Sequence, residues 1–185
     1  MIATSHYERK IHELLLQDPF RLQALNTIAQ LNLPQCFIAA GFVRNLVWDH
    51  LHSKTTPTPL NDIDVIYFDA SEQQKDKYQE YETKLHSIAP KYNWQVRNQA
   101  FMHTRNGDKP YNSTLDAIGY WPEKETALAV RKINQNQFEC ISAFGFESLF
   151  AMQVTHNPRR KLEVFNLRVH SKDWLATWPN LTIVS

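Results

Sequence analysis

The chain has 185 residues, of which 20 are basic and 19 are acidic, so its formal net charge is +1 at pH 7. A nearly neutral chain has no long-range field that would concentrate nucleic acid on its surface, although a local basic patch is compatible with RNA binding. The length fits one domain, which we expect to span residues 1–185. Because no apolar run reaches membrane-spanning length and the first residues lack an apolar signal core, we expect a cytoplasmic protein with no membrane segment.

Residues 6–31 form the first predicted unit, a pair of helices. Asp18 followed by Pro19 is typical of an N-cap and the first helical position, which places the start of the second helix. Leucine and isoleucine residues then recur at helical spacing up to Leu31. We expect these helices to cover a sheet and to take no part in chemistry.

Residues 36–51 predict a short buried strand, a tight turn and a helix. The apolar run Cys36–Ala40 ends at Gly41, one of only four glycines in the chain. Apolar residues then follow helical spacing from Phe42 to Leu51. A glycine at the start of a helix lets a phosphate approach the free backbone N–H groups, and Arg44 can add a charge-assisted contact.

A pair of carboxylates opens the next predicted strand, Asp62-Ile63-Asp64 followed by the apolar run 65–68. Residues i and i+2 of a strand face the same side, so their Cβ atoms lie roughly 7 Å apart. Two such acids raise the cost of ionising each other unless a cation neutralises them, and oxygen ligands suit Mg²⁺. We therefore predict a magnesium site at Asp62 and Asp64, with the polar, proline-containing loop 53–61 positioned over it.

The position of the acids excludes some alternatives. They precede the apolar run, whereas phosphatases with an aspartyl nucleophile place the pair after it. Neither a Walker A pattern nor a G-x-G-x-x-G pattern occurs in the chain, which removes the common glycine-loop phosphate sites. A lone Asp-x-Asp also occurs in glycosyltransferases, so the preceding Gly41 and Arg44 carry much of the argument.

The remaining elements are predicted from local signals. Ser71 begins a capping-box pattern for a helix that runs to about Ala89. A strand follows at 94–99, with His103 on the same stretch as a minor pocket candidate. Further strands are expected at 114–118, 126–133 and 138–142, the last two joined by a turn at 134–136. Residues 146–154 predict a helix, and Asn157-Pro158 is typical of the start of the last one.

The basic triplet Arg159-Arg160-Lys161 is the densest positive cluster in the sequence. We expect a solvated helix start there, with a phosphate or RNA contact as the alternative. A third carboxylate for the predicted metal site stays open among Asp116, Glu123 and Glu139, of which Asp116 is the first candidate.

Several of these patterns together resemble a known family. Gly41-Phe-Val-Arg44-Asn45, a helix and then Asp62-Ile-Asp64-Val resembles the head domain of nucleotidyltransferases of the DNA polymerase beta superfamily. It is most similar to CCA-adding tRNA nucleotidyltransferases, which read Gly-Gly-x-Val-Arg-Asp and Asp-Ile-Asp. The segments 125–130 and 143–149 are similar to later motifs of that family. The sequence around Trp121-Pro122-Glu123 resembles that of a compact bacterial nucleotidyltransferase-like family of unassigned substrate.

The resemblance implies an α+β fold with a small mixed or antiparallel central sheet flanked by helices. It places N-terminal helices at 1–31, a catalytic core at 36–155, and a C-terminal helix and tail at 157–185. Asp62 and Asp64 would bind Mg²⁺ or Mn²⁺, and Asp116 would be the third catalytic acid. Gly41, Arg44 and Asn45 would bind the phosphates of an NTP. The implied activity is transfer of a nucleoside monophosphate to a hydroxyl acceptor.

Three departures from the family pattern define the alternatives. Phe42 stands where we expect the second small residue of the phosphate turn, the paired arginines before the 125–130 segment are replaced by Trp121-Pro122-Glu123, and the nucleotide-selecting helix has no counterpart. A catalytically inactive nucleotide-binding or regulatory module on the same fold is therefore the main alternative, ahead of a purely structural protein. The acceptor stays open among a small hydroxyl compound, an RNA end and a protein side chain.

Overall fold

The two N-terminal helices begin at the residues that their caps predict. In the computed structural model, which describes residues 5–185, α1 (His6–Leu16) starts with a capping box between Ser5 and Glu8. Helix α2 (Pro19–Ala29) starts with Asp18, whose carboxylate accepts the backbone N–H of Arg21. The first four residues of the expected 1–185 domain lie outside the described part.

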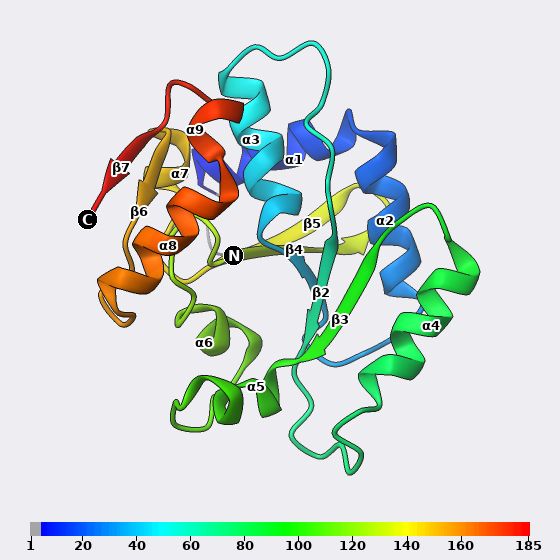
Figure 1. The fold of residues 1–185 in the computed structure, drawn as a ribbon. Coiled ribbons are helices and arrows are strands. Elements are labelled where there is room, and N and C mark those ends of the chain that lie inside the picture. Colours follow the sequence, from blue (N-terminus) through cyan, green and yellow to red (C-terminus); the bar gives the residue numbers. More distant parts are fainter. Residues whose placement is uncertain (1–4) are drawn as a thin grey trace.

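Five short strands form the central sheet in the order β3-β2-β1-β4-β5 (Figure 1). Their bounds are β1 (Phe37–Ala39), β2 (Ile63–Tyr67), β3 (Trp94–Asn98), β4 (Leu128–Asn134) and β5 (Gln137–Ser142). Strands β2 and β3 are parallel, and the other neighbours are antiparallel. The expected α+β class with a mixed, mostly antiparallel sheet flanked by helices is therefore confirmed.

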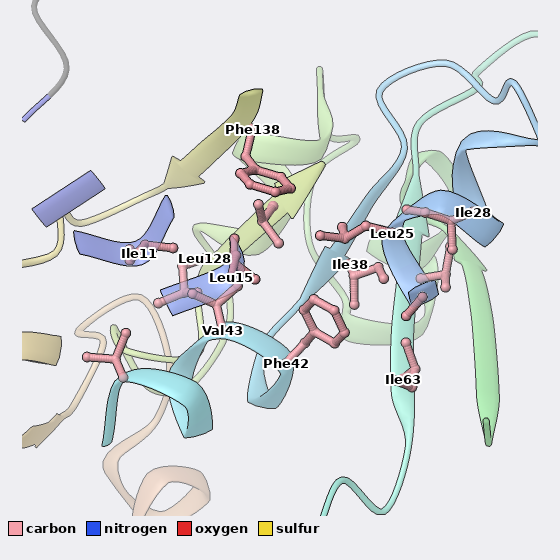
Figure 2. Close-up of a cluster of buried hydrophobic side chains, with 14 of the residues drawn as sticks. Ile11, Leu15, Leu25, Ile28, Ile38, Phe42, Val43, Ile63, Leu128 and Phe138 are labelled. Carbon is pink, nitrogen blue, oxygen red and sulfur yellow. The ribbon is translucent and has the colours of Figure 1, made fainter. Parts of the chain in front are cut away.

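One face of the sheet carries the main hydrophobic core. Helices α1 and α2, α3 (Gly41–Leu51) and α4 (Tyr78–Ile88) contribute to this core, in which Phe42 and Val43 of α3 lie among side chains of α1, α2, β1 and β4 (Figure 2). A smaller apolar cluster on the other face includes Phe37, Ile66 and Ile118. Since β2 alternates between these faces, Ile63 and Val65 enter the main core while Asp64 and Ile66 face the other way.

Short elements after β3 close the second face of the sheet. Helix α5 (Gln99–Asn106) begins directly at the end of β3, and α6 (Thr114–Ile118) brings Ile118 into the smaller cluster. After the β4–β5 hairpin come α7 (Glu147–Phe150), β6 (Gln153–Thr155), α8 (Leu162–Lys172), α9 (Trp174–Thr177) and β7 (Thr182–Val184). Strands β6 and β7 form a separate parallel pair.

Tryptophan rings join the C-terminal segment to helix α3. The ring of Trp48 lies edge-on to Trp174 at 6.2 Å and to Trp178 at 5.2 Å between centroids. All three side chains are buried, and the Trp48 indole N–H also donates to the carbonyl of Leu149. This packing places α9 beside α3 (Figure 1).

The predicted capping box at Ser71 is wrong, because the residues around it are engaged elsewhere. The Ser71 hydroxyl donates to Asp69, and the Glu72 carboxylate accepts from Tyr67, Tyr81 and Asn98. Asp69 also accepts the Ser71 backbone N–H, which is the donor that the Gln74 side chain would accept in a capping box. The chain makes turns through 71–77, and α4 begins at Tyr78 with no side-chain cap.

The expected strand at 114–118 and helix at 146–154 also differ from the structure. Residues 114–118 are helical because the Ser113 hydroxyl caps them by accepting the N–H of Asp116. Residues 146–154 divide into the short helix α7 and strand β6. The last helix begins at Leu162, since Asn157 is fully buried and its amide donates to the carbonyls of Gly119 and Trp121.

Within residues 5–185, no helix is long and apolar enough to cross a membrane.

Candidate active site

The turn between β1 and α3 has an unusual backbone. Ala40 has φ +55° and ψ −121°, a conformation that favours glycine, and it immediately precedes Gly41. Within the described chain no side chain caps the N-terminus of α3, so its first N–H groups are available to a ligand. An anion is the ligand that the N-terminus of a helix favours.

Phe42, which stands where we expect the second small residue of the phosphate turn, packs its side chain into the core. Its side chain is only 1% exposed and lies within the main core (Figure 2). Its carbonyl accepts a hydrogen bond of 2.7 Å from the buried guanidinium of Arg21. The position in this turn whose backbone conformation favours glycine is instead that of Ala40.

Replacing Ala40 with glycine is expected to raise the free energy of unfolding by about 1 kcal/mol, because glycine adopts a positive φ without strain. Chemical denaturation by urea would measure the change. Ala39→Gly is the matched control, since Ala39 is also buried but belongs to strand β1, where glycine should destabilise. A loss of stability in Ala40→Gly equal to that of the control would contradict the argument.

Arg44 occupies a buried position beside the turn. Its guanidinium lies over the rings of Trp174 and Trp48, at 4.8 and 5.2 Å from their centroids. It donates to the Thr126 hydroxyl at 2.9 Å and to the Asn45 side-chain oxygen at 3.1 Å. Burial lowers the pKa of Arg44 to about 10, while nearby carboxylates, Glu123 foremost, act in the opposite direction. An anion bound here would find a fixed, poorly solvated positive charge.

Asp62 and Asp64 lie at the start of β2, on the face away from the main core. Asp62 accepts a 3.4 Å hydrogen bond from the Gln95 side chain on the neighbouring strand β3. Burial, followed by the charge of Asp62, raises the pKa of Asp64 to about 6, against the opposing effect of Arg44. A cation would remove this repulsion and favour the ionised form.

The donor set fits one kind of metal site. No group of three or more His, Cys, Asp or Glu side chains within residues 5–185 is arranged to hold a metal ion. A pair of carboxylates alone suits Mg²⁺, which commonly binds through one or two carboxylates and completes its shell with water and substrate phosphates. The site therefore fits a magnesium ion that binds together with a phosphate ligand.

The five residues predicted to bind the metal or the phosphates line a single cleft with a volume of about 440 Å³. Gly41, Arg44 and Asn45 come from α3, and Asp62 and Asp64 from the start of β2. The loop 53–61 borders the same cleft through its second half, as predicted. The other lining residues are Ala40, Thr58, Pro59, Leu60, Asn61, Trp121, Pro122, Thr126, Arg168, Lys172, Trp174, Thr177 and Trp178.

None of the three candidates for a third carboxylate lines the cleft. Asp116 lies on α6, not on a strand, and accepts the backbone N–H of Asn112 at 2.9 Å. Glu139 on β5 pairs with Arg131 across the hairpin. Glu123 is fully buried and pairs with Arg168.

The C-terminal contribution to the cleft was not predicted. Arg168, Lys172, Trp174, Thr177 and Trp178 all lie beyond the expected catalytic core of 36–155. The sequence drew attention to the denser triplet 159–161, where Arg160 pairs with Asp108 and Arg159 lies over the Tyr120 ring. The spacing of Arg168 and Lys172, one helical turn apart, was the signal that could have indicated a shared cationic face.

The mixed sheet, the paired acids at the start of β2 and the uncapped turn before α3 are typical of a nucleotidyltransferase-type domain. The profile of the Nucleotidyltransferase family matches residues 26–183, so the chain belongs to this family. A search of curated proteins gave no match.

Solved structures agree with this assignment. The chain is similar to an NMR structure described as revealing a CCA-adding enzyme head domain, with 30% identity, a TM-score of 0.83, and 98% and 97% of the two chains covered. It also matches a CCA-adding enzyme in complex with CTP (13% identity, TM-score 0.62) and an apo form (14%, 0.58). These two matches span 95% and 94% of this chain but only 43% and 42% of the two enzymes, and they show the fold alone.

Proposed function

We propose that this protein is a metal-dependent nucleotidyltransferase, which moves a nucleoside monophosphate from an NTP to a hydroxyl acceptor. The observation that carries the proposal is that Asp62 and Asp64 share one cleft with the N-terminus of α3 and with Arg44. Paired acids with a cationic phosphate site are the parts that phosphoryl chemistry requires, because catalysis there depends on positioning and on neutralising charge.

Each residue has a separate task in this scheme. Asp62 and Asp64 would hold Mg²⁺ or Mn²⁺, which when bound neutralises triphosphate charge and favours deprotonation of the acceptor hydroxyl. The N–H groups at Gly41 and the guanidinium of Arg44 would bind phosphate oxygens of the NTP. Asn45 would orient Arg44 through their hydrogen bond. The rings of Trp48 and Trp174, which both contact the guanidinium, would restrict its movement.

The alternative is a nucleotide-binding or regulatory module without catalysis. One observation favours it, namely that Asp116, Glu123 and Glu139 all lie outside the cleft lining. Without a third acid, only two protein carboxylates are available to the reaction. Nucleotide binding by the acid pair and the α3 turn is common to both functions, and product formation separates them.

Thermal stability in the presence of each NTP tests the proposal. With Mg²⁺ or Mn²⁺, an NTP at 100 times its dissociation constant should add about 2.7 kcal/mol to the free energy of unfolding. The Asp62→Asn/Asp64→Asn variant should lose this metal-dependent gain. CTP is the first nucleotide to test, since one similar enzyme was solved in complex with it.

A pyrophosphate-release assay then decides whether the bound NTP reacts. Small hydroxyl compounds, an RNA with a free 3′ end and protein hydroxyls serve as the acceptor panel. Release that requires both metal and acceptor would support the transferase. Metal-dependent binding with no release for any acceptor would favour the inactive module, and no binding of any NTP would overturn both.

A further inference from the structure

Helix α8 presents two cations to the cleft that contains the acid pair. Arg168 and Lys172 are four residues apart, so they lie on the same side of the helix, and both line the cleft together with Asp62 and Asp64. They come from the C-terminal part of the chain and have no role in the scheme above.

Arg168 is held in place by a buried carboxylate. Its Nε and Nη2 atoms donate to the two oxygens of Glu123 at 2.5 and 3.3 Å. The Glu123 side chain is 1% exposed, whereas that of Arg168 is 34% exposed. A bidentate pair of this kind fixes the plane of the guanidinium. Glu123 therefore orients a cation at the edge of the cleft and leaves part of that cation open to the solvent.

Lys172 has the opposite character, because it is exposed and takes part in no ion pair within the described residues. Its charge acts on Asp64 across the cleft, and the charge of Arg168 acts on Arg44. Two arginines that repel each other across a shared cleft, with a free lysine beside them, form a suitable site for an anion of several charges.

We propose that α8 forms a polyphosphate-binding wall, in which Arg168 and Lys172 bind the β- and γ-phosphates of the NTP, and this inference rests on the proposed function. Glu123, considered above as a third acid, is then a positioning residue for Arg168. The C-terminal segment becomes part of the active site, held against α3 by the packing of Trp48 with Trp174 and Trp178.

Inorganic tripolyphosphate is the probe, because it carries the phosphates without a base or a reaction. Calorimetric titration would use wild type with Mg²⁺ and, without any metal, an Asp62→Asn/Asp64→Asn background. In that background, asparagines remove the acid charge, so the cationic wall is measured independently of metal and catalysis. We expect Lys172→Gln and Arg168→Gln each to weaken binding about tenfold in both settings.

Matched controls separate this wall from general surface charge. Lys161→Gln removes a lysine at the other end of α8, exposed and outside the cleft lining, and should leave affinity unchanged. Lys172→Arg should restore most of the affinity. Glu123→Gln should weaken tripolyphosphate binding in the presence of Arg168 but cause no further loss in Arg168→Gln, a dependence that a merely structural role would not produce.

Equal affinities in wild type, Lys172→Gln and Arg168→Gln would overturn the wall, as would an equal loss in Lys161→Gln. Absence of tripolyphosphate binding in both settings would also overturn it. The proposed function fails by a different result, the absence of metal-dependent NTP binding. A protein that binds tripolyphosphate through α8 but shows no such NTP binding would keep the wall and lose the function.

Discussion

Replacing Asp64 with asparagine is expected to abolish nucleotidyl transfer while making the nucleotide-free protein more stable. A metal ion held by Asp62 and Asp64 would contribute several kcal/mol to stabilising the transition state, so its loss should lower the rate by at least about a thousandfold. In the absence of metal, however, the Asp64 charge is unfavourable because it is buried beside Asp62. One substitution therefore changes activity and stability in opposite directions.

The gain in stability has a definite pH dependence. The pKa of Asp64 is about 6 in the folded protein, above its ordinary value of 3.8, so the folded state retains its proton over that interval. Stability of the wild type consequently falls as the pH rises between these two values. Asp64→Asn should be no more stable than wild type below the lower value, and more stable by up to about 3 kcal/mol above pH 6.

Urea denaturation in EDTA at several pH values, together with the pyrophosphate-release assay, measures both effects. Asp76→Asn is the control, since Asp76 is an exposed carboxylate in the turn before α4 and should change neither quantity. If Asp64→Asn lost stability above pH 6, Asp64 would be a structural residue and not a strained site residue. Retention of transfer in the variant would remove Asp64 from the chemistry.

Replacing Asp49 with alanine is expected to destabilise the protein by about 3 kcal/mol, because buried donors lose a charged acceptor. It should also weaken NTP binding, because two of these donors, Thr58 and Trp178, line the cleft. Asp49 of α3 is 7% exposed and accepts from the Thr58 N–H at 2.7 Å and hydroxyl at 2.6 Å. It also accepts from the Trp178 indole at 2.8 Å. One carboxylate thus joins α3, the loop 53–61 and the C-terminal segment at the border of the cleft.

A double-mutant cycle tests this coupling. Trp178→Phe removes the indole donor but keeps an aromatic ring beside Trp48. Its effect on the free energy of unfolding should be smaller in the Asp49→Ala background than in wild type, because the shared hydrogen bond is already lost. Asp49→Asn keeps one acceptor and should cost less than Asp49→Ala. Strictly additive effects would show that Asp49 does not link these segments.

Local signals in the sequence were sufficient for much of the fold. The caps at Asp18 and Ser113 act on the residues next to them, yet only the first was recognised, because Thr114–Ile118 is too short to show helical spacing. Ser71 shows the opposite error: its sequence context is that of a capping box, but Asp69 accepts both its backbone N–H and its hydroxyl. Asp69 competes with the helix for the polar groups of Ser71, and a rule based on the spacing of cap residues does not include such competitors.

The sequence by itself determined the acid pair and the glycine turn before α3, since strand alternation and helix-start chemistry depend on neighbouring residues. Only the tertiary structure placed Arg168, Lys172 and the two tryptophans of the C-terminal segment in the same cleft. Their position depends on contacts between segments far apart in the chain, such as Trp48 with Trp178 and Glu123 with Arg168. Such contacts leave no periodic pattern in the sequence, because each is set by the packing of whole helices against the sheet.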